Sequence, residues 1–282
     1  MLRRYLYACL FLFISNLLFA GTLQWQAKIA YQKNLPQQGY YRLIEAHNNT
    51  FGKTVYIHAV YMPQQRYHAF LVGQPNILRY FSGLDVHANT KKHHAILGIN
   101  GGYFTPSYAP LGLLIINHHV IAPLRRSKLL SGLILINNQG RLSIKWRSTY
   151  YKNAKFAFQS GPFLLTPRGR YLSKSKPEAS RRTVLAITKQ GNLLALSTTP
   201  ITLANLASIL KHHPKTLTSE PLKAAINLDG GTSSAMTLFL PEEKALVIPE
   251  RLPVRSVLMF APRVSFAGVP GQVMLFNRVS GV

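Results

Sequence analysis

The sequence predicts a strand-rich α+β fold in a single mixed domain with a few helices, and two observations lead to this prediction. Hydrophobic residues make up 47% of the 282-residue chain, which is enough for a sizeable core. Short runs of apolar and β-branched residues recur along the chain with turn residues between them. Because no Pro/Ser-rich linker, internal repeat or low-complexity tract separates these runs, we expect residues 21–282 to form one domain.

The apolar runs and the turn residues between them give the expected strands in chain order. In the first half, strands are expected at 23–31, 40–46, 54–61, 67–72, 95–100, 111–117, 132–136 and 142–146. In the second half, they are expected at 155–159, 163–165, 183–188, 193–197, 224–228, 235–240 and 254–260. The turn residues of 137–140 and 189–192 each lie between two strands, which predicts two hairpins.

Two segments have the features of helices. Residues 76–93 are irregular and are expected to hold one helix. The clearer helix is expected at 203–211, where apolar residues recur at helical spacing. Thr202 is a suitable N-cap for this helix, and Pro214 prevents its continuation.

The N-terminus has the pattern of a secretory signal. Two arginines precede a nearly all-apolar stretch at 10–19, and Ala20 offers a small-residue cleavage site. We therefore expect residues 1–20 to be a signal peptide and the protein to be exported, periplasmic or secreted; an uncleaved N-terminal anchor is the alternative. Cys9, the only cysteine, lies in this segment, so disulfides and Cys-ligated zinc are excluded for the mature chain.

The charge of the chain is strongly positive. It has 33 Lys and Arg residues against 8 acidic ones, a formal net charge of +25. Such an excess favours anionic partners such as anionic glycans, lipid head groups or nucleic acid; the alternative is that it reflects general composition and solubility. The basic residues form short pairs and no long block, and aromatic and basic residues do not interleave, so no nucleic-acid partner is expected.

One of the two aspartates stands in an unusual place for a chain so poor in acids. Asp229 follows an apolar run and precedes Gly230 and Gly231, with Ser233 and Ser234 close behind. A carboxylate next to a buried strand is costly without partners. Two glycines let the backbone turn sharply and let another group come close. This combination indicates a binding or catalytic site.

A second segment follows the same plan. The apolar run at 96–99 ends in Asn100, Gly101 and Gly102, with an amide where the other segment has a carboxylate. Two buried strands that end in such residues would form a common polar floor. The alternative is a pair of ordinary strand-ending turns, since Asn-Gly and Asp-Gly are frequent turn sequences.

Four blocks of the sequence resemble a known family. Gly98–Phe104 resembles the Asn-Gly-Gly-Phe/Tyr-Phe signature of the phosphodiester glycosidases, and 227–236 is similar to their Leu-Asp-Gly-Gly-Gly-Ser-Ser block, with Thr232 in place of the third glycine. The residues at 159–162 and 180–183 resemble the Ser-Gly-Pro and Pro-Arg-Thr-Ala blocks. The blocks come in the family's order and span about 94–260.

The resemblance implies an exported hydrolase that cleaves a sugar-1-phosphodiester linkage, in a cell-envelope, capsular or other anionic glycan. Asp229 is then expected to act as nucleophile or general base, and Arg182 to clamp the phosphate. Asn100, Ser160 and Ser234 are expected to orient sugar hydroxyls or phosphate oxygens. The remaining residues expected to bind substrate are Gly101, Gly102, Gly161, Gly230, Gly231 and Ser233.

A second carboxylate is harder to find. Glycosidases ordinarily use two, one of them as the acid. Glu178, four residues before Arg182, is a weak second acid with a solvated loop glutamate as the alternative, and Asp85 is expected in a helix or turn. A phosphate leaving group eases this shortage, since its second pKa is about 6 and it needs little protonation.

Other features of the sequence limit the remaining chemistry. The family's late Arg-Pro-Val segment is changed here, so either Arg251 or Arg255 takes the place of its arginine. The histidines occur as adjacent pairs, which point to opposite faces of a strand, and no metal or cofactor is expected. The alternative function is a non-catalytic binder of anionic glycan or peptidoglycan that uses the same pocket, with association with the cell envelope.

Overall fold

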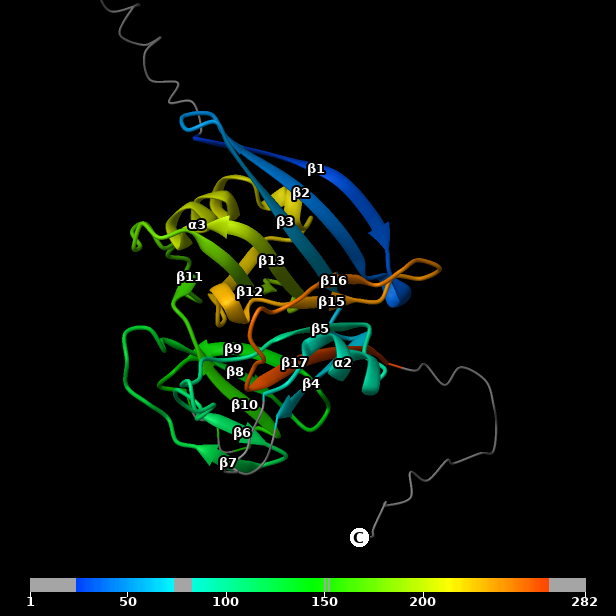
Figure 1. Cartoon of the computed structure of the whole chain (residues 1–282), viewed down its shortest axis with the longest axis vertical. Helices are drawn as coiled ribbons and strands as arrows, with labels where there is room; N and C mark the ends of the chain where they lie inside the picture. The colour runs from blue at the N-terminus through cyan, green and yellow to red at the C-terminus, as the bar shows by residue number, and fades with distance from the viewer. Residues whose placement is uncertain (1–23, 74–82, 150, 152, 264–282) are drawn as a thin grey trace, which may run out of the picture.

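The computed structural model describes residues 24–73, 83–149, 151 and 153–263. Within these ranges the chain forms three antiparallel sheets and few helices, which confirms the expected strand-rich α+β class. Figure 1 shows the first three strands at one end of the molecule and the second sheet at the opposite end.

The first sheet has seven strands in the order β1-β2-β3-β13-β12-β14-β11. Every neighbouring pair is antiparallel. Its strands are β1 (Trp25–Asn34), β2 (Tyr40–Asn48), β3 (Lys53–Met62), β11 (Phe163–Leu165), β12 (Ser180–Thr188), β13 (Leu193–Ile201) and β14 (Leu222–Asn227). The expected hairpin at 189–192 joins β12 to β13.

The second and third sheets have five strands each. The second has the order β7-β6-β10-β8-β9, from β6 (Leu114–Ile116), β7 (His119–Ala122), β8 (Gly132–Ile136), β9 (Leu142–Trp146) and β10 (Phe156–Ser160). The third has the order β16-β15-β5-β17-β4, from β4 (Tyr67–Gly73), β5 (Leu97–Asn100), β15 (Met236–Leu238), β16 (Leu246–Ile248) and β17 (Ser256–Pro262). The expected hairpin at 137–140 joins β8 to β9.

The helices in the described part of the chain are short. They are α2 (Val86–Lys92), α3 (Leu203–His212) and α4 (Pro214–Leu217), with 3-10 turns η1 (Pro36–Gln38) and η2 (Gly231–Ser233). The Thr202 hydroxyl accepts a hydrogen bond from the Asn205 N–H, so Thr202 caps α3 as expected. Pro214 ends α3 and also begins α4, a position that proline tolerates.

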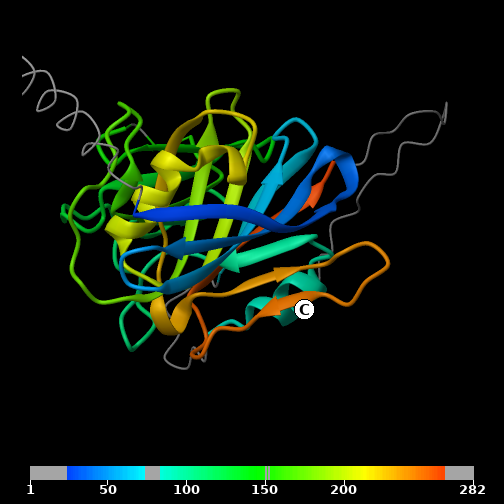
Figure 2. The ribbon, with the colours of Figure 1, turned by 90° about the horizontal axis from the view of Figure 1, so that it is seen from above.

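One buried cluster joins the three sheets. It includes Leu185 and Ile226 from the first sheet, Phe158 from the second, and Ile99 and Leu258 from the third. A second cluster packs α3 onto the other face of the first sheet (Figure 2). On the third sheet, α2 lies against β5 and β15 (Figure 2).

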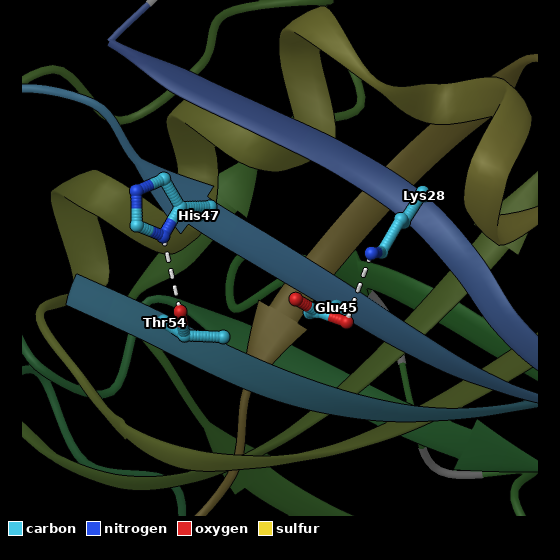
Figure 3. Close-up of polar contacts among 4 residues, drawn as sticks. All are labelled: Lys28, Glu45, His47 and Thr54. Carbon is cyan, nitrogen blue, oxygen red and sulfur yellow. Dashed lines mark hydrogen bonds and ion pairs between the residues drawn. The ribbon is translucent and has the colours of Figure 1, made fainter. Parts of the chain in front are cut away.

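The outer face of β1–β3 is polar. The Lys28 ammonium pairs with the Glu45 carboxylate at 3.3 Å, and a His47 ring nitrogen lies 3.0 Å from the Thr54 hydroxyl (Figure 3). Such cross-strand pairs suit an exposed sheet surface. On β2 and β3, alternate residues such as Ile44, Ala46, Val55 and Ile57 are fully buried.

Several sequence-based element boundaries were wrong. The strand expected at 111–117 is confined to Leu114–Ile116, since Gly112 at φ +115° breaks the extended backbone before it. β7 was missed because its two-residue turn, Asn117 and His118, has positive φ at both positions without the usual glycine. β16 was missed because its three residues have little apolar periodicity.

The segment at 76–93 holds a helix, as expected. Of the segment at 76–93, the described part forms α2 from Val86 to Lys92, and residues 76–82 lie outside the described residues. The expected signal peptide at 1–20 also lies outside them. Within the described ranges, no helix combines the length and apolar character needed to cross a membrane.

Candidate active site

The two Gly-Gly segments meet where the first and third sheets adjoin. Asn100 ends β5 and Asn227 ends β14. The Asp229 N–H donates to the Gly101 carbonyl at 3.3 Å, which brings the segments side by side. The turn of η2 follows Asp229 and lies beside β12 (Figure 1). The two strand ends thus form one polar floor.

Asn100 holds this floor together. Its side chain is fully buried, and its amide oxygen accepts from the Thr183 hydroxyl at 2.7 Å and the Ala235 N–H at 3.1 Å. Its amide nitrogen donates to the Asp229 carbonyl at 2.8 Å. All strong hydrogen bonds of Asn100 are therefore internal, and they fix the backbone beneath the carboxylate.

The Asp229 side chain is mostly buried. Burial raises the pKa of its carboxyl, whereas hydrogen bonds from the Ser233 hydroxyl and the Gly230 N–H lower it. The Gly230 nitrogen lies 2.9 Å from the carboxylate oxygen. Over the described ranges, no side-chain cation lies within ion-pair distance of this carboxylate. Asp229 therefore has hydrogen-bond donors but no counter-ion.

Arg182 lies on β12 close to the Gly230 turn. Its Nε donates to the Ile201 carbonyl at 3.0 Å, and its Nη2 donates to the Glu178 carbonyl at 3.0 Å. Its Nη1 has no hydrogen-bond partner in the described part of the chain and lies 3.6 Å from where a Cβ atom on Gly230 would be. Burial lowers the pKa of this half-buried guanidinium. A cation that is fixed, desolvated and unneutralised is suited to an anionic ligand.

Tyr103 belongs to the same floor, and the sequence analysis missed it as a site residue. Its hydroxyl donates to the Gly161 carbonyl at 2.7 Å and accepts from the Asn227 amide at 2.8 Å. Burial raises the pKa of Tyr103 most, and the Asp229 charge raises it further, while the Asn227 hydrogen bond and the Arg182 charge lower it. The hydroxyl therefore lies in the electric field of both Asp229 and Arg182.

The Ser160–Gly161 block packs onto the same floor. The Ser160 hydroxyl and the Gly161 N–H both donate to the Asn227 carbonyl, at 2.9 and 3.0 Å. Ser160 is fully buried. Gly161 has φ +149°, and a Cβ atom there would overlap the Leu129 carbonyl oxygen, so the position requires glycine.

The residues after the Asp-Gly-Gly turn differ in their partners. Ser233 hydrogen-bonds the Asp229 carboxylate, whereas the buried Ser234 hydroxyl has no hydrogen-bond partner within the described residues. Gly231 has φ +63° and shapes the turn. Gly101 and Gly102 are needed for packing, because a Cβ atom would overlap Ser256 at one and press on the Gln159 carbonyl at the other.

A comparison with known protein families covers the part of the chain that holds these residues. The model of the phosphodiester glycosidase family matches residues 93–260, more than half of the chain. The chain belongs to the phosphodiester glycosidase family. All the site residues named above fall within the matched range.

Two solved structures share the fold of this phosphodiester glycosidase family member. The catalytic domain of zebrafish N-acetylglucosamine-1-phosphodiester alpha-N-acetylglucosaminidase, auto-inhibited by its pro-peptide, has a TM-score of 0.58 and 19% identity, covering 86% of this chain and 90% of its own. A hypothetical protein from Synechocystis has a TM-score of 0.58 and 13% identity, covering 80% of this chain and 62% of its own. No curated protein matches the sequence.

The remaining acids of this family member are placed differently from Asp229. The Glu178 side chain is exposed, and it is the backbone carbonyl of Glu178 that receives Arg182. Asp85 caps α2 by accepting from the Ala88 N–H at 2.6 Å. Glu250, which the sequence analysis did not consider, accepts from the Val86 N–H at 2.8 Å and interacts with the Arg181 charge.

The late arginines differ in burial. Arg251 is exposed, and its N–H donates to the Thr232 carbonyl at 2.7 Å, next to the Gly-Gly turn. Arg255 is 3% exposed and lines a small cavity together with Tyr103 and Gln159. Burial lowers the pKa of Arg255.

The candidate site does not lie in the 510 Å³ hollow found on the protein surface. A hollow of about 510 Å³ lies on another part of the surface, lined by Gln65, Asn137, Gln139, Arg141 and Arg263. Its lining contains no carboxylate and none of the residues around Asp229. The described residues also hold no cluster of three His, Cys, Asp or Glu side chains that could bind a metal ion. The chemistry of the Asp229 region, and not the volume of a cavity, identifies the candidate site.

Proposed function

We propose that the chain is an exported hydrolase that cleaves a sugar-1-phosphodiester linkage in a cell-envelope, capsular or other anionic glycan. The observation that carries this proposal is the position of the Arg182 guanidinium beside Gly230, the turn residue whose N–H holds the Asp229 carboxylate. Among the described residues, neither the Asp229 carboxylate nor the Arg182 guanidinium forms an ion pair, with each other or with another side chain. Such an arrangement leaves each charge available to a substrate.

Arg182 is the phosphate clamp in this proposal. Two of its nitrogens bind backbone carbonyls, which fixes the plane of the guanidinium. Nη1 remains to donate to a phosphate oxygen beside the Gly230 turn. A positioned donor of this kind stabilises the charge that develops on the leaving phosphate.

Asp229 acts as nucleophile or general base. In both roles the bond between the anomeric carbon and the phosphate oxygen breaks, and the phosphate monoester leaves with the electron pair. As general base, Asp229 takes a proton from the attacking water; as nucleophile, it forms a glycosyl ester that water then hydrolyses. The departing phosphate has a second pKa of about 6, so it leaves without a strong acid. This removes the need for a second carboxylate at the place of the exposed Glu178.

Three further groups position the reacting parts. The Asn100 amide holds the Asp229 backbone, and the Ser233 hydroxyl orients its carboxylate. The unpartnered Ser234 hydroxyl is a candidate to bind a sugar hydroxyl or a phosphate oxygen. We assign Gly230 and Gly231 to the wall that allows the substrate's close approach. Gly101, Gly102 and Gly161 pack against protein atoms and Ser160 is fully buried, so these four residues support the floor from within.

A release assay tests this proposal. Purified protein is incubated with UDP-N-acetylglucosamine and with a synthetic glycosyl phosphodiester, and free sugar is measured. We expect release by the wild-type protein and none by Asp229→Asn, with both proteins folded by circular dichroism. Full activity of Asp229→Asn would overturn the mechanism.

The alternative is a non-catalytic binder of anionic glycan or peptidoglycan at the same pocket. The observation that favours it is the single carboxylate at the site, together with the net charge of +25. Retained binding with no sugar release from either substrate would support the binder. We place either function outside the cytoplasm because of the N-terminal signal pattern at 1–20, with association with the envelope through anionic glycan.

A further inference from the structure

A basic segment runs between β7 and β8 and lies next to the site. It comprises residues 123–130 and carries Arg125, Arg126 and Lys128, all of them exposed. Across the described ranges, no carboxylate lies within ion-pair distance of any of the three. The segment thus presents three unneutralised cations in eight residues.

Gln159 fixes the shape of this basic segment. Its side chain is 2% exposed, and its amide oxygen accepts from the Leu113 N–H at 3.1 Å and the Arg125 N–H at 3.0 Å. Its amide nitrogen donates to the Arg125 carbonyl at 2.6 Å and the Leu130 carbonyl at 2.9 Å. One buried amide therefore binds the segment at Arg125 and at Leu130, so the backbone that carries the three cations loses little conformational freedom when a ligand binds.

The basic segment borders the site through Gly161. A side chain at Gly161 would overlap the Leu129 carbonyl, so the two backbones touch. The Gly161 carbonyl in turn accepts from Tyr103, which lies in the fields of Asp229 and Arg182. The chain of direct contacts from the segment to the reacting groups is therefore Leu129, Gly161 and Tyr103.

We propose that the basic segment is a subsite for the repeated anionic groups of a polyanionic glycan, which extends from the scissile linkage along Arg125, Arg126 and Lys128. The proposal rests on the proposed function, because it names the substrate class that the same site takes. The segment contains no aromatic residue on which bases could stack, which favours a glycan over single-stranded nucleic acid.

Binding measurements on matched variants test the subsite. The first variant combines R125A, R126A and K128A. Its control combines K189A, K211A and K215A, which removes the same charge from exposed positions on the β12–β13 turn and on α3 and α4. Two polymers, a glycerol-phosphate teichoic acid and polygalacturonate, separate phosphate from carboxylate groups, and neutral dextran controls for uncharged glycan.

The expected result is an affinity for at least one anionic polymer about tenfold lower in the first variant than in the control, on the order of what three exposed ion contacts supply. Gln159→Met keeps the side-chain volume and loses the four hydrogen bonds. It is expected to weaken polymer binding and to speed amide hydrogen exchange across 123–130. If that variant does not fold, the comparison of the two triple variants still tests the proposed subsite.

Equal loss of binding in the two triple variants would overturn the subsite, since charge alone would then explain the affinity. A larger loss for single-stranded DNA than for both glycan polymers would overturn it too, in favour of a nucleic-acid surface. The sugar-release assay on the wild-type protein is a separate test. Absence of sugar release would exclude the proposed hydrolase activity, whereas the binding comparison reports on the subsite alone.

Discussion

The side-chain amide of Asn100 donates a hydrogen bond to the backbone carbonyl of Asp229, with 2.8 Å between nitrogen and oxygen. These residues are 129 positions apart in the sequence; Asn100 ends β5 of the third sheet, and Asp229 follows β14 of the first sheet. Because the amide is fully buried, no water competes for this bond. The placement of the candidate catalytic carboxylate therefore depends on Asn100, whose side-chain oxygen and nitrogen are both occupied by internal hydrogen bonds.

Asn100→Ala is expected to lower the free energy of unfolding by about 2–4 kcal/mol, since it leaves Thr183, Ala235 and Asp229 with unpaired buried groups. Urea unfolding measures this loss. Asn138→Ala, at an exposed turn, serves as the control and is expected to change stability by less than about 0.5 kcal/mol. A similar small effect at both positions would mean that the Asn100 hydrogen bonds do not hold the floor.

Most strands were predictable because their signals are local. The hairpins at 137–140 and 189–192 carry glycine and asparagine, which favour the positive φ that tight turns require. The turn at Asn117 and His118 has the same positive φ without glycine, so the sequence pattern did not indicate that a second strand, β7, follows it. Local chemistry therefore predicts a turn only where the favoured residues are present.

The site was predictable in its residues more than in their roles. Asp229 and Arg182 stand out in the sequence as a rare acid and a basic pair. The ends of β5 and β14 meet through contacts between residues far apart in the sequence, and no turn pattern encodes such contacts. Tyr103 follows a Gly-Gly pair, where an aromatic residue suggests packing alone, and its role depends on the distant Asn227 and Gly161.

Asp229→Asn is expected to make the protein more stable at neutral pH while it removes sugar release. Burial raises the pKa of Asp229 above 3.8, so the folded state binds its proton more tightly than the unfolded state. The stability gained from that proton is fully present below the unfolded pKa and is lost as pH rises through the folded pKa. The gain of Asp229→Asn over wild type is therefore expected to grow as pH rises from 3.8 through the folded pKa. Urea unfolding at a series of pH values measures it, and a gain that does not change with pH would exclude this origin.

Ser233→Ala is expected to move the acidic limb of the pH–activity profile to higher pH. Catalysis requires ionised Asp229 in either of its proposed roles, so kcat/KM should fall as pH drops through the pKa of this carboxyl. The Ser233 hydroxyl lowers that pKa by hydrogen bonding. Without this hydroxyl, less remains to offset the effect of burial, and the pKa of Asp229 rises. Profiles of wild type and Ser233→Ala, compared with Ser173→Ala at an exposed position, measure the shift. A limb that moves to lower pH would mean that Ser233 does not stabilise the ionised form.

Arg182→Lys is expected to lower kcat/KM on a glycosyl phosphodiester by about 100-fold or more, the size of effect typical of losing one positioned donor. Arg182 uses two nitrogens to bind the Ile201 and Glu178 carbonyls and presents a third beside Gly230. The single amine of a lysine cannot occupy all three positions. Arg170→Lys, at an exposed position, is the control and is expected to match wild type. Near wild-type activity of Arg182→Lys would show that a point charge is sufficient and that the fork geometry is not used.

Tyr103→Phe tests whether the hydroxyl that joins Gly161 and Asn227 supports the floor. Its removal leaves the Asn227 amide and the Gly161 carbonyl without this partner, which is expected to cost about 1–3 kcal/mol of unfolding free energy. Tyr56→Phe, at a side chain that is 43% exposed, is expected to cost less than about 0.5 kcal/mol. Because Gly161 also touches the basic segment at Leu129, polymer binding is expected to weaken with Tyr103→Phe and to stay unchanged with Tyr56→Phe. Equal stability of the two variants would mean that the Tyr103 hydroxyl contributes nothing to the stability of the floor.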